Sequence, residues 1–318
     1  MDNLTHALTG VVLSRAGLNR WYAHSTALLV LAANAPDIDI VAAFGGSLNY
    51  FVNHRGITHS IAMAPVVALL PVLVVCAFSR SLKGLKAAYA ISLIGVASHL
   101  LLDWTNAYGI RLLLPFSSRW LRADLNSLVD LWIWGVLLIA TLGPLLGRLV
   151  SSEIGAQPGS GRGLAWFAIA FLLVYDFGRY LTHQRALEML NSRVYQGTPP
   201  IRAAAFPAGS VNPFEWSGWV DLPQVALHFP LNVRSDFDPT APDRTFYKPD
   251  PSPATEAARQ TYPVRKFLEF AQYPLWRVTP VADPEGAQRV DVWDLRFPFT
   301  ASAVVDPSNR VLSSSFRF

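Results

Sequence analysis

Asn53-His54-Arg55-Gly56-Ile57-Thr58-His59-Ser60 sets two histidines and an arginine directly before an apolar run, Ile61 to Phe78. A membrane-length helix that begins on such groups is unfavourable unless they have partners, because unpaired polar and charged groups are costly in an apolar medium. The rest of the chain offers partners that can also bind a metal, namely His6, Asp37, Asp39, His99 and Asp103. We therefore expect these side chains to converge at one end of a helical bundle and to hold one or two metal ions.

The composition indicates a membrane protein. Of 318 residues, 52% are hydrophobic and only 15% are charged, whereas soluble domains carry about 25% charged residues. The net charge of +4 is small, and the basic residues are scattered without interleaved aromatics, so we expect no nucleic-acid partner. The single cysteine, Cys76, excludes an intramolecular disulfide and a cysteine-rich zinc site. Met1 to His6 lacks the positive charge of a signal peptide, so we expect internal segments to direct insertion.

Hydrophobic patterning predicts a mainly α, polytopic membrane bundle over residues 1–183. Short helices are expected at 3–16 and 24–35, and the second stops at Pro36 because proline disfavours helix in the preceding residue. Four longer apolar segments approach the ~20 residues needed to cross a bilayer, namely 60–79, 87–104, 128–149 and 164–182. We therefore expect about four spans in addition to the short N-terminal helices.

The composition changes after about residue 185. Prolines become frequent there and long apolar runs disappear. From Leu275 onward the sequence alternates as strands do, with Asp-Pro turn signals at 283–284 and 306–307. We expect residues 184–318 to form a water-facing α+β domain that ends in a small antiparallel sheet.

A topology of four spans places the candidate ligands on one side of the membrane. The segment before residue 60, the loop 105–127 and everything after 183 then share one face. The loop 80–86 and the Gly/Ser-rich linker 151–163 lie on the other. Because the ligand positions were not used to choose the spans, this grouping supports a single site.

His99 and Asp103 form the most specific metal-ligand pair. Residues i and i+4 on a helix share a face, about 5–6 Å apart at Cβ, so both can reach one ion. The alternative is a hydrogen bond that satisfies two buried groups. Asp37 and Asp39, two residues apart, face the same way in an extended segment, although a helix-terminating turn also favours aspartate. His6, on the first helix, faces the same side of the membrane.

The opening stretch and the loop after the second span supply candidate catalytic residues. Gly56 predicts that His54 lies on a turn and His59 on the first helical turn, where one can bind the metal while the other acts as general acid or base. Arg55 can hold a phosphate or carboxylate in a bidentate fork, or extend to lipid headgroups. Asp124 can serve as an outer ligand or orient one. We take His54, Arg55 and Asp124 as the candidate catalytic residues.

The ligand set suits a divalent metal ion, with zinc favoured and manganese as the alternative. Such an ion lowers the pKa of a bound water and polarises an ester or phosphoryl oxygen. The sequence has no Walker loop, GxGxxG, HExxH, GxSxG or CxxC motif. The expected chemistry is therefore metal-dependent hydrolysis.

The motifs resemble those of the YdjM-like membrane-bound metal-dependent hydrolases, a family named for a LexA-regulated inner-membrane member. The matching segments lie within roughly residues 1 to 150, namely Leu4-Thr5-His6 with Gly10, Ala35-Pro36-Asp37-Ile38-Asp39, His54-Arg55-Gly56-Ile57-Thr58-His59-Ser60, Ser98-His99-Leu100-Leu101-Leu102-Asp103, Asn106-Ala107-Tyr108-Gly109 and Leu114-Pro115-Phe116-Ser117. The resemblance implies a multi-pass protein of the bacterial inner membrane. It also implies the ligand set His6, Asp37, Asp39, His54, His59, His99 and Asp103. A distant likeness to zinc-dependent phospholipase C, in the order of the His and Asp motifs, favours phosphoesters.

We expect a hydrolase that acts at the membrane surface on a lipid or lipid-linked ester or phosphoester. Membrane lipids would then be its partners. The alternative is a non-enzymatic membrane anchor or scaffold with a structural metal. A transporter needs polar residues through the depth of the bilayer, which the first and third predicted spans lack.

The positive-inside rule predicts the orientation. Basic residues occupy the two short loops on the side away from the site, namely Arg80, Lys83, Lys86, Arg148 and Arg162. We therefore expect the site and the C-terminal domain on the extracytoplasmic side, although Arg111, Arg119 and Arg122 on the site side oppose this assignment.

Overall fold

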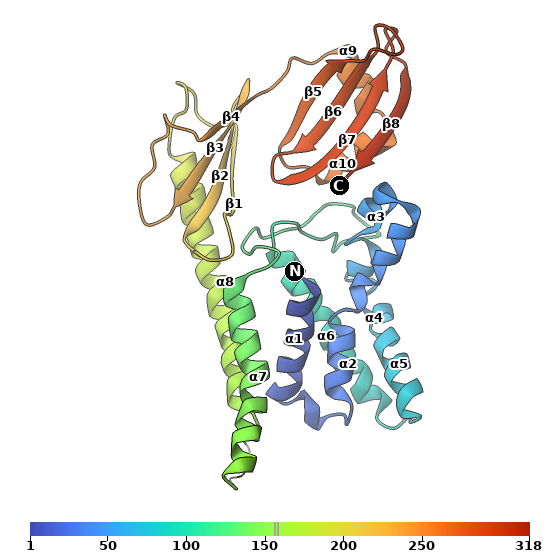
Figure 1. The fold of residues 1–318 in the computed structure, drawn as a ribbon, viewed down its shortest axis with the longest axis vertical. Helices are drawn as coiled ribbons and strands as arrows, with labels where there is room; N and C mark the ends of the chain where they lie inside the picture. The colour runs from blue at the N-terminus through green and yellow to red at the C-terminus, as the bar shows by residue number, and fades with distance from the viewer. Residues whose placement is uncertain (156, 158) are drawn as a thin grey trace.

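The computed structural model describes residues 1–155, 157 and 159–318 as a helical bundle with two β-sheets at one end (Figure 1). Two residues of the linker expected at 151–163 lie outside this description. The order of a helical N-terminal half and a C-terminal α+β region confirms the expected fold class. The antiparallel sheet expected at the end of the C-terminal region is present, and a second antiparallel sheet, which the sequence did not predict, precedes it.

Residues 3–59 form short helices that pack closely on one another. Their bounds are α1 Asn3–Ala16, η1 Leu18–Arg20, α2 Ser25–Ala32, η2 Ala35–Gly45, α3 Ser47–Asn53 and η3 Ile57–His59. Gly10 lets α1 approach α2, because a Cβ at this position would lie 2.8 Å from the carbonyl oxygen of Leu29. Two of these elements, α1 and α2, thus run side by side beneath the N-terminus (Figure 1).

Among the residues that the structure describes, three helices are long and apolar enough to cross a membrane, and up to five spans result if two bent helix pairs each count as one. The three are α6 Leu85–Thr105, α7 Leu131–Glu153 and α8 Arg162–Asn191. They correspond to the predicted spans at 87–104, 128–149 and 164–182. The last of them, α8, continues past the domain boundary expected at residue 183.

The predicted span at 60–79 is not one straight helix. It is divided into α4 Ala64–Val67 and α5 Leu69–Ser79, and together with residues 47–59 it bends by 89°. Pro71 accounts for the break between α4 and α5, because it lacks the N–H that would donate to the carbonyl of Val67. The sequence predicted the apolar character of this segment but not its division into α4 and α5.

The C-terminal region contains two four-stranded antiparallel sheets, and two helices separate them in the sequence. The first sheet has the order β1 Arg202–Pro207, β2 Glu215–Asp221, β3 Val225–Asn232 and β4 Arg244–Tyr247. The helices are α9 Pro253–Arg259 and α10 Tyr262–Phe270. The second sheet has the order β5 Pro274–Pro280, β6 Gln288–Asp294, β7 Phe297–Val305 and β8 Val311–Arg317, which confirms the strands expected from Leu275 onward.

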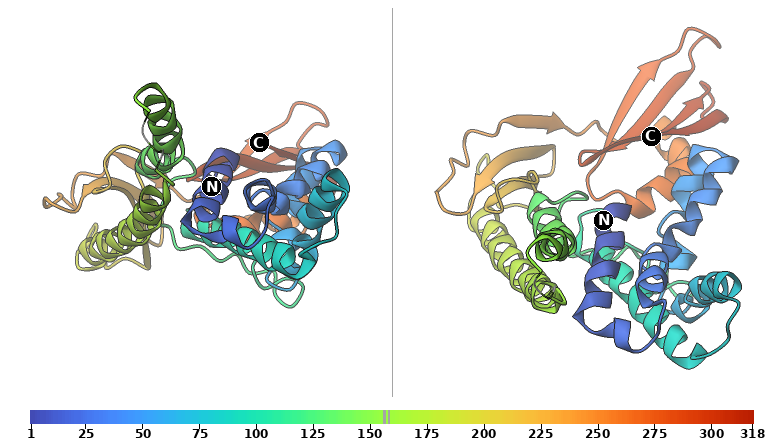
Figure 2. Two further views of the ribbon diagram at one scale, coloured as in Figure 1. Left: turned by 90° about the horizontal axis from the view of Figure 1, so that it is seen from below. Right: turned by 60° about the horizontal axis from the view of Figure 1, so that its bottom comes forward.

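The second sheet and α10 pack over the part of the bundle that carries the candidate site. Phe51 of α3 contacts Phe270 and Phe316 in an aromatic core, which also includes Tyr108 and Trp120 from the loop after α6. Both turned views place α3 beside this sheet (Figure 2). The C-terminal region therefore covers α3 and the 106–130 loop.

Polar contacts strengthen the same attachment. Arg296 Nη1 donates to the carbonyl of Ala107 at 3.0 Å, and Ser47 Oγ donates to the carbonyl of Phe316 at 3.2 Å. The α3 helix leads directly into His54 and Arg55, while the loop after Ala107 begins with Tyr108. The C-terminal sheet thus restrains two segments that border the site.

Candidate metal centre

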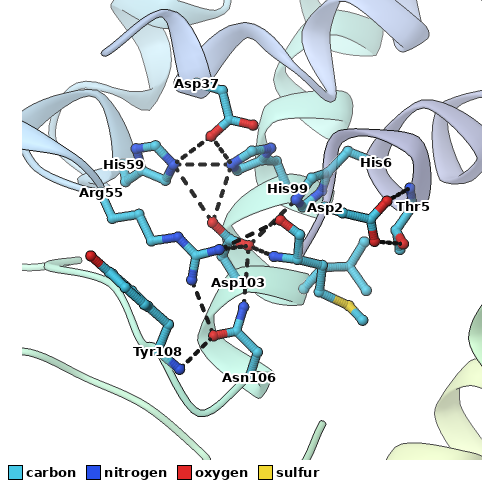
Figure 3. Close-up of polar contacts among 12 residues, drawn as sticks. Asp2, Thr5, His6, Asp37, Arg55, His59, His99, Asp103, Asn106 and Tyr108 are labelled. Atoms are coloured by element: carbon cyan, nitrogen blue, oxygen red, sulfur yellow. Dashed lines mark hydrogen bonds and ion pairs between the residues drawn. The ribbon is translucent and has the colours of Figure 1, made fainter. Parts of the chain in front are cut away.

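Two histidines and two aspartates from three elements meet in a buried cluster at the sheet-facing end of the bundle (Figure 3). Asp37 comes from η2, His59 from η3, and His99 and Asp103 from successive turns of α6. One ligand atom from each lies within 4.8 Å of the others. Only Asp37 is partly exposed, so the cluster opens on the side of this carboxylate.

The spacing within the cluster suits a single ion. The Nε2 atoms of His59 and His99 are 3.1 Å apart. Asp37 Oδ1 lies 3.4 and 3.7 Å from these two nitrogens, and Asp103 Oδ2 lies 3.6 and 3.4 Å from them. Four ligands arranged tetrahedrally with bonds of ~2.0–2.1 Å would be ~3.3–3.4 Å apart. These four residues could therefore bind a metal ion with little movement.

The hydrogen bonds behind both histidines leave their Nε2 atoms free to act as ligands. His99 Nδ1 lies 2.7 Å from the carbonyl of Ala33, which can only accept, so Nδ1 must carry the hydrogen. A hydrogen on His59 Nδ1 would serve Asp39 Oδ2 at 3.3 Å, and the Thr58 hydroxyl at 3.1 Å can accept or donate beside it. Two Nε2 lone pairs then face each other, an arrangement that requires a cation or a proton between them.

The remaining polar groups of the cluster fit a cation as well. Asp103 Oδ2 is buried and has no hydrogen-bond partner within the described part of the chain, yet it faces both Nε2 atoms. Three carboxylates, of Asp37, Asp39 and Asp103, stand against the single guanidinium of Arg55. With neutral imidazoles these side chains alone carry a net charge of −2, which favours a cation at this position.

Arg55 is held inside the protein and does not extend toward lipid headgroups. Its side chain donates from Nη2 to Asp103 Oδ1 at 3.0 Å and from Nη1 to Asn106 Oδ1 at 3.1 Å. The guanidinium also lies over the ring of Tyr108, 4.9 Å from its centroid, and the residue is 4% exposed. Asn106 and Tyr108 belong to the quoted Asn-Ala-Tyr-Gly motif, although the sequence gave no reason to place them against Arg55.

Asp39 lies behind the four-atom cluster and connects it to His54. Its Oδ1 is 3.2 Å from His54 Nδ1, and its Oδ2 accepts from the backbone N–H of Arg55 at 2.8 Å as well as facing His59. This position suits orientation of His59 more than direct ligation. His54 occupies the turn after α3 and His59 lies in η3, which confirms the interpretation of Gly56.

His6 adjoins the cluster without belonging to the four-atom group. Its ring stacks on His99 with 3.8 Å between centroids, and its Nε2 is 3.4 Å from Asp103 Oδ1. Both ring nitrogens of His6 are buried and form no hydrogen bond in the described structure. The backbone nitrogen of Met1 contacts the same Asp103 oxygen. The first helix therefore closes one side of the site.

Asp124 is the one candidate that the structure does not bring to the cluster. It lies in the loop before α7, beside Arg122 and beside Arg296 of the C-terminal region. Burial raises the pKa of the Asp124 carboxyl to about 6, and the two arginines oppose that rise. Its surroundings indicate a role in attaching the C-terminal region, separate from the metal centre.

A pocket of about 320 Å³ opens beside the cluster. Its polar walls include Asp37, Tyr50, His54, Arg55 and Tyr108. Because Asp37 belongs to both the cluster and the pocket, a molecule in this space would contact the ligand group directly. The pocket is the feature that distinguishes this cluster from a closed structural site.

The C-terminal region holds a second polar network, which sequence did not reveal because His228 has no partner nearby in the chain. Ser217 Oγ is 2.8 Å from His228 Nε2, and His228 Nδ1 is 2.5 Å from Asp243 Oδ1. The order of groups resembles a serine hydrolase triad. However, Ser217 lies within β2, which pairs with a strand on each side, so the sheet uses its backbone amides. We interpret this network as a cross-strand clamp.

Comparison with known proteins identifies the family. The profile of the YdjM inner membrane protein family matches residues 1–186, more than half of the chain, and the protein belongs to this family. It is also similar to the uncharacterized protein YfhP of Bacillus subtilis (strain 168), with 30% identity over 142 residues. That similarity covers 42% of this chain and 43% of YfhP. No solved structure matches the chain.

The cluster predicts metal content that depends on both histidines. We expect His59→Ala and His99→Ala to lose most of the metal bound by the purified protein, because each removes one of four ligand atoms. Asp39→Asn should retain metal with affinity reduced about 10–100-fold, as outer-shell changes do. Elemental analysis of detergent-purified protein measures this, with the exposed His24→Ala as control. Equal metal content in all of these variants would contradict the assignment.

Asp124 predicts a pH-dependent difference in stability. Its pKa of about 6 in the folded protein lies above the usual 3.8, so the folded state binds more protons between these values. The contribution of Asp124 to stability is therefore present below pH 4 and lost as pH rises through 6. Relative to Asp124→Asn, the wild type should lose on the order of 1–3 kcal/mol over this range. Thermal unfolding at several pH values measures it, and parallel curves would contradict it.

Proposed function

We propose that this member of the YdjM inner membrane protein family is a metal-dependent hydrolase that acts on a lipid or lipid-linked ester or phosphoester at the membrane surface. The observation that carries the proposal is the position of two histidine nitrogens and two carboxylate oxygens, within 4.8 Å of one another, at the wall of a pocket of about 320 Å³. A site built only to hold the bundle together would not need such an opening.

Zinc is the ion that this donor set favours. Two imidazoles and two carboxylates would suit zinc, whereas manganese prefers more oxygen ligands. Bound at this position, such an ion supplies Lewis acidity and lowers the pKa of a water molecule. His59, His99, Asp37 and Asp103 would hold it, and His6 would pack against His99 from the side of α1.

Arg55 and His54 supply the groups that act on the substrate from the pocket wall. The Arg55 guanidinium is fixed by Asp103 and Asn106, so it presents a positive charge beside the ligand group without needing to reorganise. Such a charge stabilises negative charge that develops on an ester or phosphoryl oxygen. His54 contacts Asp39 through Nδ1, which leaves Nε2 to exchange a proton with a leaving group.

A structural metal in a membrane anchor is the second candidate. The cluster joins η2, η3 and α6, and Arg55 adds the turn after α3, so loss of a metal would also loosen the bundle. This observation favours neither function by itself. The polar pocket and the arginine at its wall favour the hydrolase.

We propose that the site and the C-terminal sheets face the extracytoplasmic side of the inner membrane. Arg80, Lys83 and Lys86 lie in or beside the connection between α5 and α6, at the end of the bundle remote from both sheets. Arg162 lies at the start of α8 on the same side. Because Lys and Arg are enriched in cytoplasmic loops, these positions support an extracytoplasmic site.

The proposed activity predicts turnover that requires Asp103. We expect the purified protein with zinc to hydrolyse bis-p-nitrophenyl phosphate, p-nitrophenyl butyrate or phosphatidylglycerol in vesicles. Asp103→Asn should lower the rate at least about 100-fold, and Arg55→Lys about 10–1000-fold with metal retained. His24→Ala should match the wild type. Unfolding on chelation without turnover of any of these substrates would favour the anchor.

The proposed orientation predicts the behaviour of C-terminal fusions. Alkaline phosphatase, which folds in an oxidising compartment, should be active when fused after Phe318. Green fluorescent protein at the same position should be dark, and a fusion in the loop at Lys83 should show the reverse pattern. Fluorescence from the C-terminal fusion would contradict this orientation.

A further inference from the structure

An apolar groove meets the polar pocket at the candidate metal centre. It lies between α2 and α5, has a volume of about 360 Å³, and is lined chiefly by Leu31, Ile38, Leu70, Pro71 and Val74. Asn3 and Asp37 line the groove and the polar pocket alike. The groove and the pocket therefore adjoin each other at the Asp37 carboxylate, which is one of the candidate metal ligands.

The groove faces outward from the helices that form it. The two helices pack through Leu28 and Leu29 of α2 against Val72 and Val75 of α5, all of which are buried. The groove residues lie beside this seam, with Leu31 41% exposed and Val74 42% exposed. Both helices belong to bent pairs that are long and apolar enough to enter a membrane, so we place the groove among lipid acyl chains.

The two spaces differ sharply in chemistry. The pocket presents the Arg55 guanidinium, His54 and two tyrosine hydroxyl groups beside the carboxylates of Asp2, Asp37 and Asp39. The groove is mostly hydrocarbon, and its polar residues are Asn3, Asn34 and Asp37. A molecule that lies across Asp37 would thus place an anionic group beside Arg55 and a hydrocarbon chain between α2 and α5. An amphiphile has this distribution, and a water-soluble metabolite does not.

We infer that the groove holds one acyl chain of an anionic glycerophospholipid whose phosphate lies beside Asp37 and Arg55. This inference rests on the proposed function and names its substrate class. Leu70 and Val74 are one helical turn apart, about 6 Å along α5, so the groove holds the first carbons of the chain. The remaining carbons stay in the bilayer, and the lipid reaches the site without leaving the membrane.

Photo-crosslinking tests the groove independently of activity. The probe is phosphatidylglycerol with a diazirine near the start of one acyl chain, reconstituted with the protein in vesicles. Crosslinks should concentrate on the groove residues of α2, η2 and α5, and Val74→Trp should reduce them at least fivefold. The matched control is Leu73→Trp, which alters an exposed residue of the same helix outside the groove. Even labelling of all exposed faces, unaffected by Val74→Trp, would overturn the inference.

Paired substrates separate this inference from the proposed function. Val74→Trp should lower phosphatidylglycerol hydrolysis at least tenfold and leave bis-p-nitrophenyl phosphate hydrolysis within twofold, whereas Leu73→Trp changes neither. Equal loss of both substrates, repeated with the milder Val74→Phe, would overturn the groove. If the wild type hydrolyses neither substrate but crosslinking still depends on Val74, the proposed function fails while the lipid site stands.

Discussion

The buried carboxylate of Asp103 is the constraint on which the helical domain depends. It lies on an apolar helix, where an unpaired charge would be strongly unfavourable, so other elements must bring compensating groups to it. Arg55 and the Met1 nitrogen contact one of its oxygens, and the imidazoles of His59 and His99 face the other. Oδ2 of Asp103 is therefore available to a cation, while Oδ1 connects the first helix and the turn after α3 to α6.

Close packing makes that convergence sterically feasible. Glycines in α1 and α6 let both helices approach α2, since a Cβ at Gly95 would lie 2.6 Å from Ala32 Cβ and one at Gly10 would strike the backbone of Leu29. From above, the C-terminal sheet and α10 cover α3 and the following loop, which fixes the segments that present Arg55 and Tyr108. The site thus combines two residues of the long helix α6 with residues from the short elements η2 and η3 and from the turn after α3.

The sequence predicted the parts of this structure that have a local signature. The i, i+4 spacing of His99 and Asp103, the helix 3–16 and the alternating strands after Leu275 all appear as expected. The first sheet was missed because Pro230 lies inside β3, where proline argues against a strand. Asp124 was predicted at the site because its loop lies on the same side of the membrane. Position along a loop does not fix the direction of a side chain, and Asp124 lies beside Arg122 and Arg296 instead. The contacts of Asp39, His54 and Arg55 depend on turns whose geometry hydrophobic periodicity does not record.

The proposed hydrolase requires one cation held by two imidazoles and two carboxylates. X-ray absorption at the zinc edge of the purified, zinc-loaded protein tests this directly, because it reports the atoms bound to the metal whatever the substrate is. We predict four or five nitrogen or oxygen neighbours at ~2.0–2.2 Å, the fifth being water, with outer-shell scattering from two imidazole rings, one of which disappears in His59→Ala. A spectrum with sulfur neighbours, or with no imidazole scattering, would contradict the account.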